Sequence, residues 1–147
     1  DARRPAILVE LLEKMAKEDI AGQRDAVEGW LVRAELAKIS RRDDETEAAY
    51  RKAMAAQPGE GRAVRGLGAF LLGTAKAAEG EGLLRQWLGK VPQDKAAYDA
   101  LYGGLVQQGR EAEAEKLLRA KVEALPGDGR SAAQLAEYWR LRGRGPE

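Results

Sequence analysis

The chain has 147 residues, of which 44% are hydrophobic and 33% charged, and its formal net charge is +1. These values are typical of one compact globular domain and give no indication that charge directs the chain to nucleic acid or to a membrane surface. Cysteine and histidine are both absent, which excludes disulfides and thiolate metal sites and removes the usual general base and the commonest transition-metal ligand.

The first predicted helix covers residues 5–17. Pro5 suits the first turn of a helix, where a backbone N–H would have no partner in any case. Five apolar side chains recur at helical spacing on one face, namely Ile7, Leu8, Leu11, Leu12 and Met15. We therefore expect this helix to pack against the segment that follows it, as a half-repeat.

An internal repeat follows the first helix. Pro58, Pro92 and Pro126 are spaced 34 residues apart. Alignment on these prolines divides the chain, without gaps, into the blocks 27–60, 61–94 and 95–128. Each block is typical of two short amphipathic helices, and in the third Gly109 marks the break between them. The prolines then end the second helix of each block.

Residues 129–142 predict one more helix, similar to the first helix of a block, and residues 143–147 form a short tail. Ser131 is a candidate N-cap near its start, as Asp94 is for the third block. Leu135 and Trp139 lie on its packing face. The sequence leaves open whether this helix closes the array or presents an apolar edge that contacts another chain.

The blocks resemble the tetratricopeptide repeat family, whose unit of about 34 residues is a pair of antiparallel helices. Residues that match the family pattern are Trp30, Tyr50, Ala53 and Pro58 in the first block, Leu67, Gly68, Gly80, Leu84 and Pro92 in the second, and Leu101, Ala114, Leu118 and Pro126 in the third. The resemblance implies an all-α fold, a right-handed superhelical solenoid of about three helix-turn-helix repeats with flanking helices.

In this family the first helix of each repeat lines a concave groove. The resemblance nominates as groove residues Leu31, Glu35, Lys38, Arg62, Arg65, Ala69, Leu72, Asp99, Gly103 and Val106. Three of them are apolar positions that the repeat core does not require, and we expect Leu31, Leu72 and Val106 to anchor an amphipathic partner segment. The alternative is that these side chains support neighbouring helices. The chain has no asparagine, so the carboxylate clamp of the family's chaperone adaptors is not expected.

The sequence thus predicts a protein–protein interaction scaffold rather than an enzyme, without metal or cofactor, as a module of a larger bacterial assembly or envelope protein. Its expected partner is a protein or peptide and not a nucleic acid. Two alternatives stay open. One is self-association into a homo-oligomer through the terminal helices, with Leu135 and Trp139 as edge contacts. The other is a chaperone of cytochrome c maturation, whose repeats residues 26–30 and 48–53 resemble.

No apolar run approaches the roughly 20 residues that a membrane-spanning helix needs, so we expect no membrane insertion of this segment. The lack of cysteine suits the bacterial periplasm, the cell envelope and the cytoplasm equally.

Overall fold

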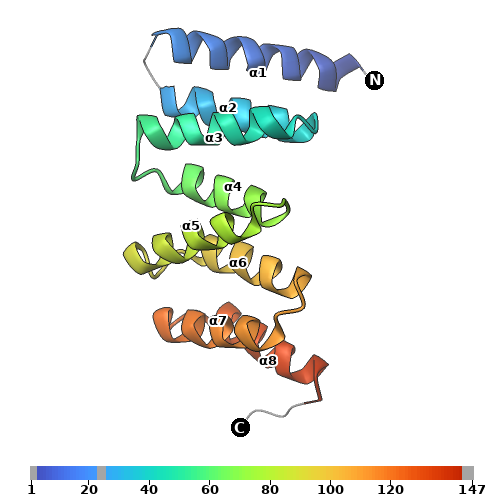
Figure 1. The fold of residues 1–147 in the computed structure, drawn as a ribbon, viewed down its shortest axis with the longest axis vertical. Coiled ribbons are helices and arrows are strands. Elements are labelled where there is room, and N and C mark those ends of the chain that lie inside the picture. The colour runs from blue at the N-terminus through green and yellow to red at the C-terminus, as the bar shows by residue number, and fades with distance from the viewer. Residues whose placement is uncertain (1–2, 23–25, 144–147) are drawn as a thin grey trace. The chain divides into compact units, whose positions relative to one another are not determined.

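The computed structural model describes the backbone of residues 3–22 and 26–143 and the side chains of residues 6–18 and 26–143. Within these ranges the chain forms eight helices and no strand, which confirms the predicted all-α class (Figure 1). The helices are α1 (Arg3–Gly22), α2 (Ala26–Ile39), α3 (Asp43–Ala56), α4 (Gly61–Leu72), α5 (Ala77–Lys90), α6 (Lys95–Gln107), α7 (Glu111–Ala124) and α8 (Gly129–Leu141).

The chain divides into two compact units, Asp1–Phe70 and Leu71–Glu147, and the boundary falls inside α4. In the first unit α1 packs on α2 and α2 packs on α3; in the second, α5, α6, α7 and α8 pack in order along the chain. Helices that are neighbours in sequence are therefore neighbours in space within each unit. This is the arrangement that a repeat of two-helix units predicts.

The turns after α2 and α6 have the same hydrogen bonds. At the first, the amide of Arg41 donates to Lys38 O and the amide of Arg42 to Ala37 O; at the second, Gly109 donates to Val106 O and Arg110 to Leu105 O. Both turns need a left-handed residue, with φ of 55° at Arg41 and 69° at Gly109. The predicted break at Gly109 is confirmed. The turn at Arg41 has the same geometry, but it was not predicted because no glycine marks it in the sequence.

Acidic residues cap the first helices of the repeats, 34 residues apart. The carboxylate of Glu60 accepts from the amide of Arg62 at 2.9 Å, and that of Asp94 from Ala97 at 3.1 Å. Asp128 accepts from the amide of Ser131 at 3.1 Å. The prediction of Asp94 is confirmed, whereas Ser131 is wrong as a cap. Asp128 has the extended conformation of an N-cap, and Ser131 already lies within α8.

The N-terminal helix is less covered than its apolar pattern predicts. Ala16 is 2% exposed where α1 meets α2, but the side chains of Ile7, Leu8, Leu11 and Met15 are 50–62% exposed. The helix does pack on the first repeat, through α2, but this contact leaves most of its large aliphatic side chains exposed. The small Ala16 lies at the contact with α2, while most of the larger aliphatic side chains lie to one side of it.

In the second unit, aliphatic side chains of α5, α6 and α7 form the core, with Leu84, Leu101, Leu105 and Leu118 at most 1% exposed. Helix α8 contributes Leu135, 7% exposed, and Tyr138, 3% exposed, to the same core. Trp87 and Trp139 pack against its margin. Leu135 is thus a core residue of the second unit, because α8 packs on α7.

A charge pair recurs in the second helix of each repeat. Glu47 pairs with Arg51 at 2.8 Å, Glu81 with Arg85 at 2.8 Å and Glu115 with Arg119 at 2.9 Å. Each glutamate precedes its arginine by four residues, the favourable orientation on a helix. The pairs are 34 residues apart, so they belong to the repeat as much as the apolar positions do.

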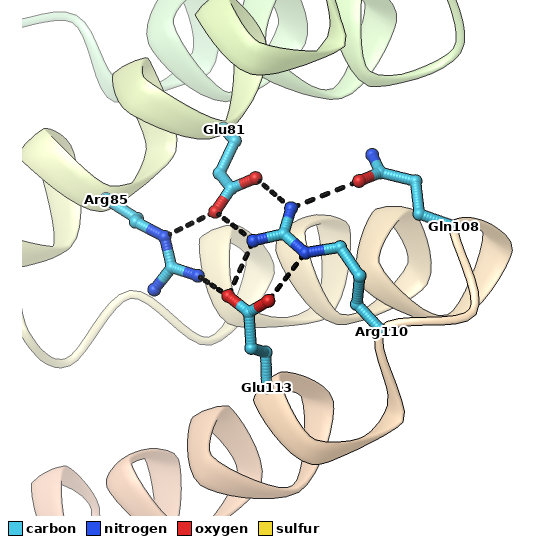
Figure 2. A network of polar contacts seen from close by, with 5 residues as sticks. All are labelled: Glu81, Arg85, Gln108, Arg110 and Glu113. Atoms are coloured by element: carbon cyan, nitrogen blue, oxygen red, sulfur yellow. Dashed lines mark hydrogen bonds and ion pairs between the residues drawn. The ribbon is translucent and has the colours of Figure 1, made fainter.

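In the second unit this pair is part of a larger network that joins α5 to α7 (Figure 2). The guanidinium of Arg110 contacts both Glu81 and Glu113 at 2.5 Å and the amide oxygen of Gln108 at 3.1 Å. Arg85 approaches Glu113 at 3.6 Å. The hydrogen bonds from Arg110 lower the pKa of both glutamates below its ordinary value. Two cations and two anions therefore alternate around one site.

Candidate protein-binding surfaces

A pocket of about 360 Å³ lies in the first unit, between α1, α2, α3 and α4. Helix α2 provides most of the wall, and single residues come from the other three helices. The lining residues are Leu12, Glu28, Leu31, Val32, Glu35, Leu36, Ile39, Tyr50 and Arg62. The wall is mostly aliphatic, with charged side chains from α2 and α4. We call it the α2 pocket.

The structure brings three of the predicted groove residues together in the α2 pocket, namely Leu31, Glu35 and Arg62. Leu31 is only 8% exposed, so it forms part of the pocket wall and is not the exposed anchor that the sequence predicts. Ile39, at the end of α2, is 73% exposed and lines the same pocket. The sequence pattern did not single out Ile39, because this residue lies beyond the last apolar position of the helical pattern.

Arg62 is the basic residue in the wall of the α2 pocket and forms two ion pairs. Its guanidinium contacts Glu28 at 2.7 Å, 34 residues earlier, and Glu60 at 3.1 Å. The hydrogen bonds from Arg62 lower the pKa of the Glu60 carboxyl. Because Arg62 and Glu28 occupy equivalent positions in successive blocks, the contact links two first helices. An acidic group of a partner that approached Arg62 would therefore have to compete with Glu28 and Glu60.

Glu35, like Arg62, has two polar partners within the first unit. Lys38 contacts its carboxylate at 2.6 Å, and the phenol of Tyr50 donates a hydrogen bond to it. Burial alone would raise the pKa of Glu35, but the bonds from Lys38 and Tyr50 outweigh it, so this pKa is lowered. Burial and the anionic Glu35 together raise the pKa of Tyr50. Tyr50 therefore stays a neutral donor that orients Glu35 at the pocket wall.

At two helical glycines, the space that a side chain would occupy is taken by a side chain of another helix. A Cβ added at Gly66 would lie 2.3 Å from Cε1 of Tyr50, and one at Gly104 would lie 2.8 Å from Cδ1 of Leu72. Leu72 is 8% exposed and belongs to the core of the second unit. The prediction that Leu72 anchors a partner is therefore wrong, since the missing side chain of Gly104 makes room for it.

The other predicted groove residues of the second unit differ in exposure. Val106 is 37% exposed, and nothing lies within 4 Å of a Cβ added at Gly103. Asp99 is exposed but contacts Nζ of the buried Lys121 at 2.6 Å. The same ammonium donates to Gln134 on α8 at 2.8 Å. Asp99 thus neutralises a buried cation, a role that the sequence did not reveal.

The remaining predicted groove residues, Lys38, Arg65 and Ala69, belong to the first unit and do not line the α2 pocket. Ala69 is exposed, and Arg65 is half-buried and has a polar partner. At the other end of the chain, Trp139 is half-buried. Its indole N–H donates to Glu115 at 3.2 Å, and Arg119 stacks on its ring at 4.9 Å. Of the two alternatives for this helix, the core burial of Leu135 and these contacts of Trp139 do not agree with an open apolar edge formed by these two residues.

Among the residues that the structure describes, no group of three or more acidic side chains is placed to hold a metal ion. In the same part of the chain, no helix combines the length and the apolar character of a membrane span.

The paired helices, their spacing and their turns define a repeat fold of the tetratricopeptide type. Solved structures share this fold, and PilW and MamA are two of them. PilW, described as a widely conserved type IV pilus biogenesis factor, aligns with a TM-score of 0.61 and 22% identity over 93% of this chain and 71% of its own. A MamA D159K mutant aligns with a TM-score of 0.56 and 17% identity over 95% of this chain and 91% of its own. At these identities the likeness establishes the fold alone. No protein-family model and no curated protein matches the chain.

Proposed function

We propose that this chain is a non-catalytic protein–protein interaction module that binds an apolar segment of a partner protein in the α2 pocket. The observation that carries the proposal is the composition of that pocket, where exposed Ile39 and half-buried Leu12 and Val32 surround about 360 Å³ of space. An amphipathic helix that presents aliphatic side chains at every third or fourth position fits such a surface.

The charged residues of the α2 pocket set its specificity. Glu28, Glu35 and Arg62 already form ion pairs within the unit, so no uncompensated charge faces the pocket. A partner with a neutral apolar face loses nothing on binding, whereas a single charge brought to the aliphatic wall pays a desolvation cost. We therefore propose a partner selected for aliphatic side chains.

The wider role that we propose is a module of a larger bacterial assembly or envelope protein. PilW, which has the same fold, is a type IV pilus biogenesis factor, and a module that binds proteins without catalysis suits an assembly role of this kind.

A selection from a random peptide library tests the pocket. Peptides that bind the protein should carry aliphatic residues at helical spacing, and Ile39→Glu should weaken their binding by at least about tenfold. Leu141→Glu is the matched control, because Leu141 is 66% exposed and lies on α8. Equal binding to both variants would assign the peptides to another surface and refute the α2 pocket.

A further inference from the structure

The exposed apolar face of α1 is separate from the function proposed above. Ile7, Leu8, Leu11 and Met15 are 62%, 56%, 52% and 50% exposed. Three of them are four residues apart, and together the four span about 100° of the helix circumference, a stripe along three turns. Singly exposed apolar residues are common, but an ordered stripe of four indicates a contact surface.

A row of alternating charges runs beside this stripe. Glu10, Lys14 and Glu18 follow one another at four-residue spacing and are all exposed, with the Lys14 side chain at 74%. By helical geometry Glu10 and Lys14 lie along one flank of the stripe, about 60–100° from Leu11, while Glu18 lies about 20° from Leu11, in line with the stripe and beyond Met15. A helix that packs on the stripe will therefore meet these charges at its own edge.

We propose that the α1 stripe is the contact surface of a homodimer, in which α1 of a second copy packs antiparallel against it around a twofold axis near Leu11. In this arrangement Leu11 faces Leu11 of the other copy and Ile7 faces Met15. The same flank of both helices lies on one side of the axis, so the charge rows also meet. Lys14 of each copy then lies within about 3 Å along the helix axis of Glu10 of the other.

The charges select this orientation over the parallel one. In a parallel pair the twofold axis runs along the helices, so the two charge rows lie on opposite sides of the contact and do not meet. The antiparallel pair brings Lys14 of each copy beside Glu10 of the other, as two opposite-charge pairs. A different protein would have to supply the complementary row by coincidence, whereas a second copy carries it by necessity.

One helix from each copy buries less than the roughly 1,200 Å² of a standard stable interface. The dimer should therefore be weak and its population should rise with protein concentration. Sedimentation equilibrium on the purified chain tests this directly. The wild type should shift from monomer toward dimer as concentration rises, and Leu11→Glu should raise the dissociation constant by at least about tenfold. Leu141→Glu should leave it unchanged.

Charge reversal tests the orientation. Glu10→Lys and Lys14→Glu should each weaken self-association, because each variant creates like-charge contacts twice across the axis. A mixture of the two variants should associate again, since every contact then joins opposite charges. Circular dichroism checks that both variants stay helical. A wild type that dimerises while the mixture does not would overturn the antiparallel α1 contact.

The absence of native cysteine allows a second readout that does not depend on affinity. Oxidation of Leu11→Cys should trap a covalent dimer, because the two sulfurs meet near the axis. Lys17→Cys is exposed on a different face of α1 and should remain monomeric under the same conditions. A chain that is monomeric at all concentrations and forms no Leu11→Cys dimer would overturn the proposal and leave the α2 pocket untouched.

Discussion

Arg110 contacts Glu81, a residue that lies 29 positions earlier in the chain, and so ties the start of α7 to α5. Whereas the side chains of the pair Arg140 and Glu137 are 69% and 52% exposed, that of Glu81 is 15% exposed and that of Arg110 33% exposed. Both also contact other members of the network in Figure 2. Such shared contacts restrain four side chains at once, which isolated pairs do not.

We therefore expect Arg110→Met to lower the thermal midpoint of unfolding of the second unit. The decrease in the thermal midpoint should be smaller at 1 M salt, where the screening length of charges is about 3 Å. Differential scanning calorimetry at low and high salt measures both effects. Arg140→Met is the control, because the pair of Arg140 and Glu137 is 69% and 52% exposed within α8. An equal shift in both variants would contradict a network role for Arg110.

Gly66→Ala should destabilise the first unit by about 1–3 kcal/mol, because the new methyl group collides with the ring of Tyr50. Tyr50 is 1% exposed and its hydroxyl is held by Glu35, so a shift of the ring would disturb that hydrogen bond. Gly103→Ala should instead stabilise the second unit by about 0.5–1 kcal/mol. Gly103 lies in the middle of α6, and a Cβ added there meets nothing within 4 Å. Urea unfolding of the two variants compares them, and a shared sign would refute the packing account.

Removing one partner of the buried Lys121 should cost more than removing the lysine itself. Asp99→Ala removes the carboxylate beside Lys121, a residue that is only 3% exposed, and leaves its ammonium with the hydrogen bond to Gln134. We expect a loss of stability of about 1–3 kcal/mol. Lys121→Met keeps the volume and removes the charge, so its effect should be within about 1 kcal/mol. Chemical denaturation distinguishes the two variants. A larger loss for Lys121→Met would show that the ion pair itself contributes net stability.

The second unit should lose stability in acid through Asp128. Hydrogen bonds from Lys95 at 2.6 Å and from Ser131 lower the pKa of Asp128 to about 2 in the folded chain. The unfolded chain has the ordinary aspartate pKa near 4. A lowered folded pKa gives stability that is present above pH ~4 and is lost as the pH falls toward ~2. NMR titration of the carboxyl carbon should place its midpoint near 2, and Lys95→Met should raise it.

Arg41→Gly should stabilise the first unit by about 1 kcal/mol. Arg41 has φ of 55°, a conformation that costs a residue with a Cβ roughly that amount, and its turn has the hydrogen bonds of the one that uses Gly109. Gly109→Ala should destabilise the second unit to a similar extent, because its φ is 69°. Thermal unfolding measures the pair. Destabilisation by Arg41→Gly would mean that the arginine side chain outweighs its backbone strain.

The sequence by itself determined the helical repeat. Prolines 34 residues apart and apolar residues at helical spacing predict where helices form and end, because both act through the local backbone. The helices observed between Ala26 and Ala124 lie where those patterns place them. The break at Gly109 and the cap at Asp94 were predictable for the same reason.

Only the tertiary structure decided which of these residues face solvent. Leu31 and Leu72 fit an exposed groove by position, but α2 and α4 turn both into the protein, and Gly104 makes the room for Leu72. Ile7, Leu8, Leu11 and Met15 fit a core by type, yet their helix is covered mainly beside Ala16. Hydrophobic spacing determines that a helix has an apolar face. Which part of that face is covered depends on neighbours that lie far along the chain.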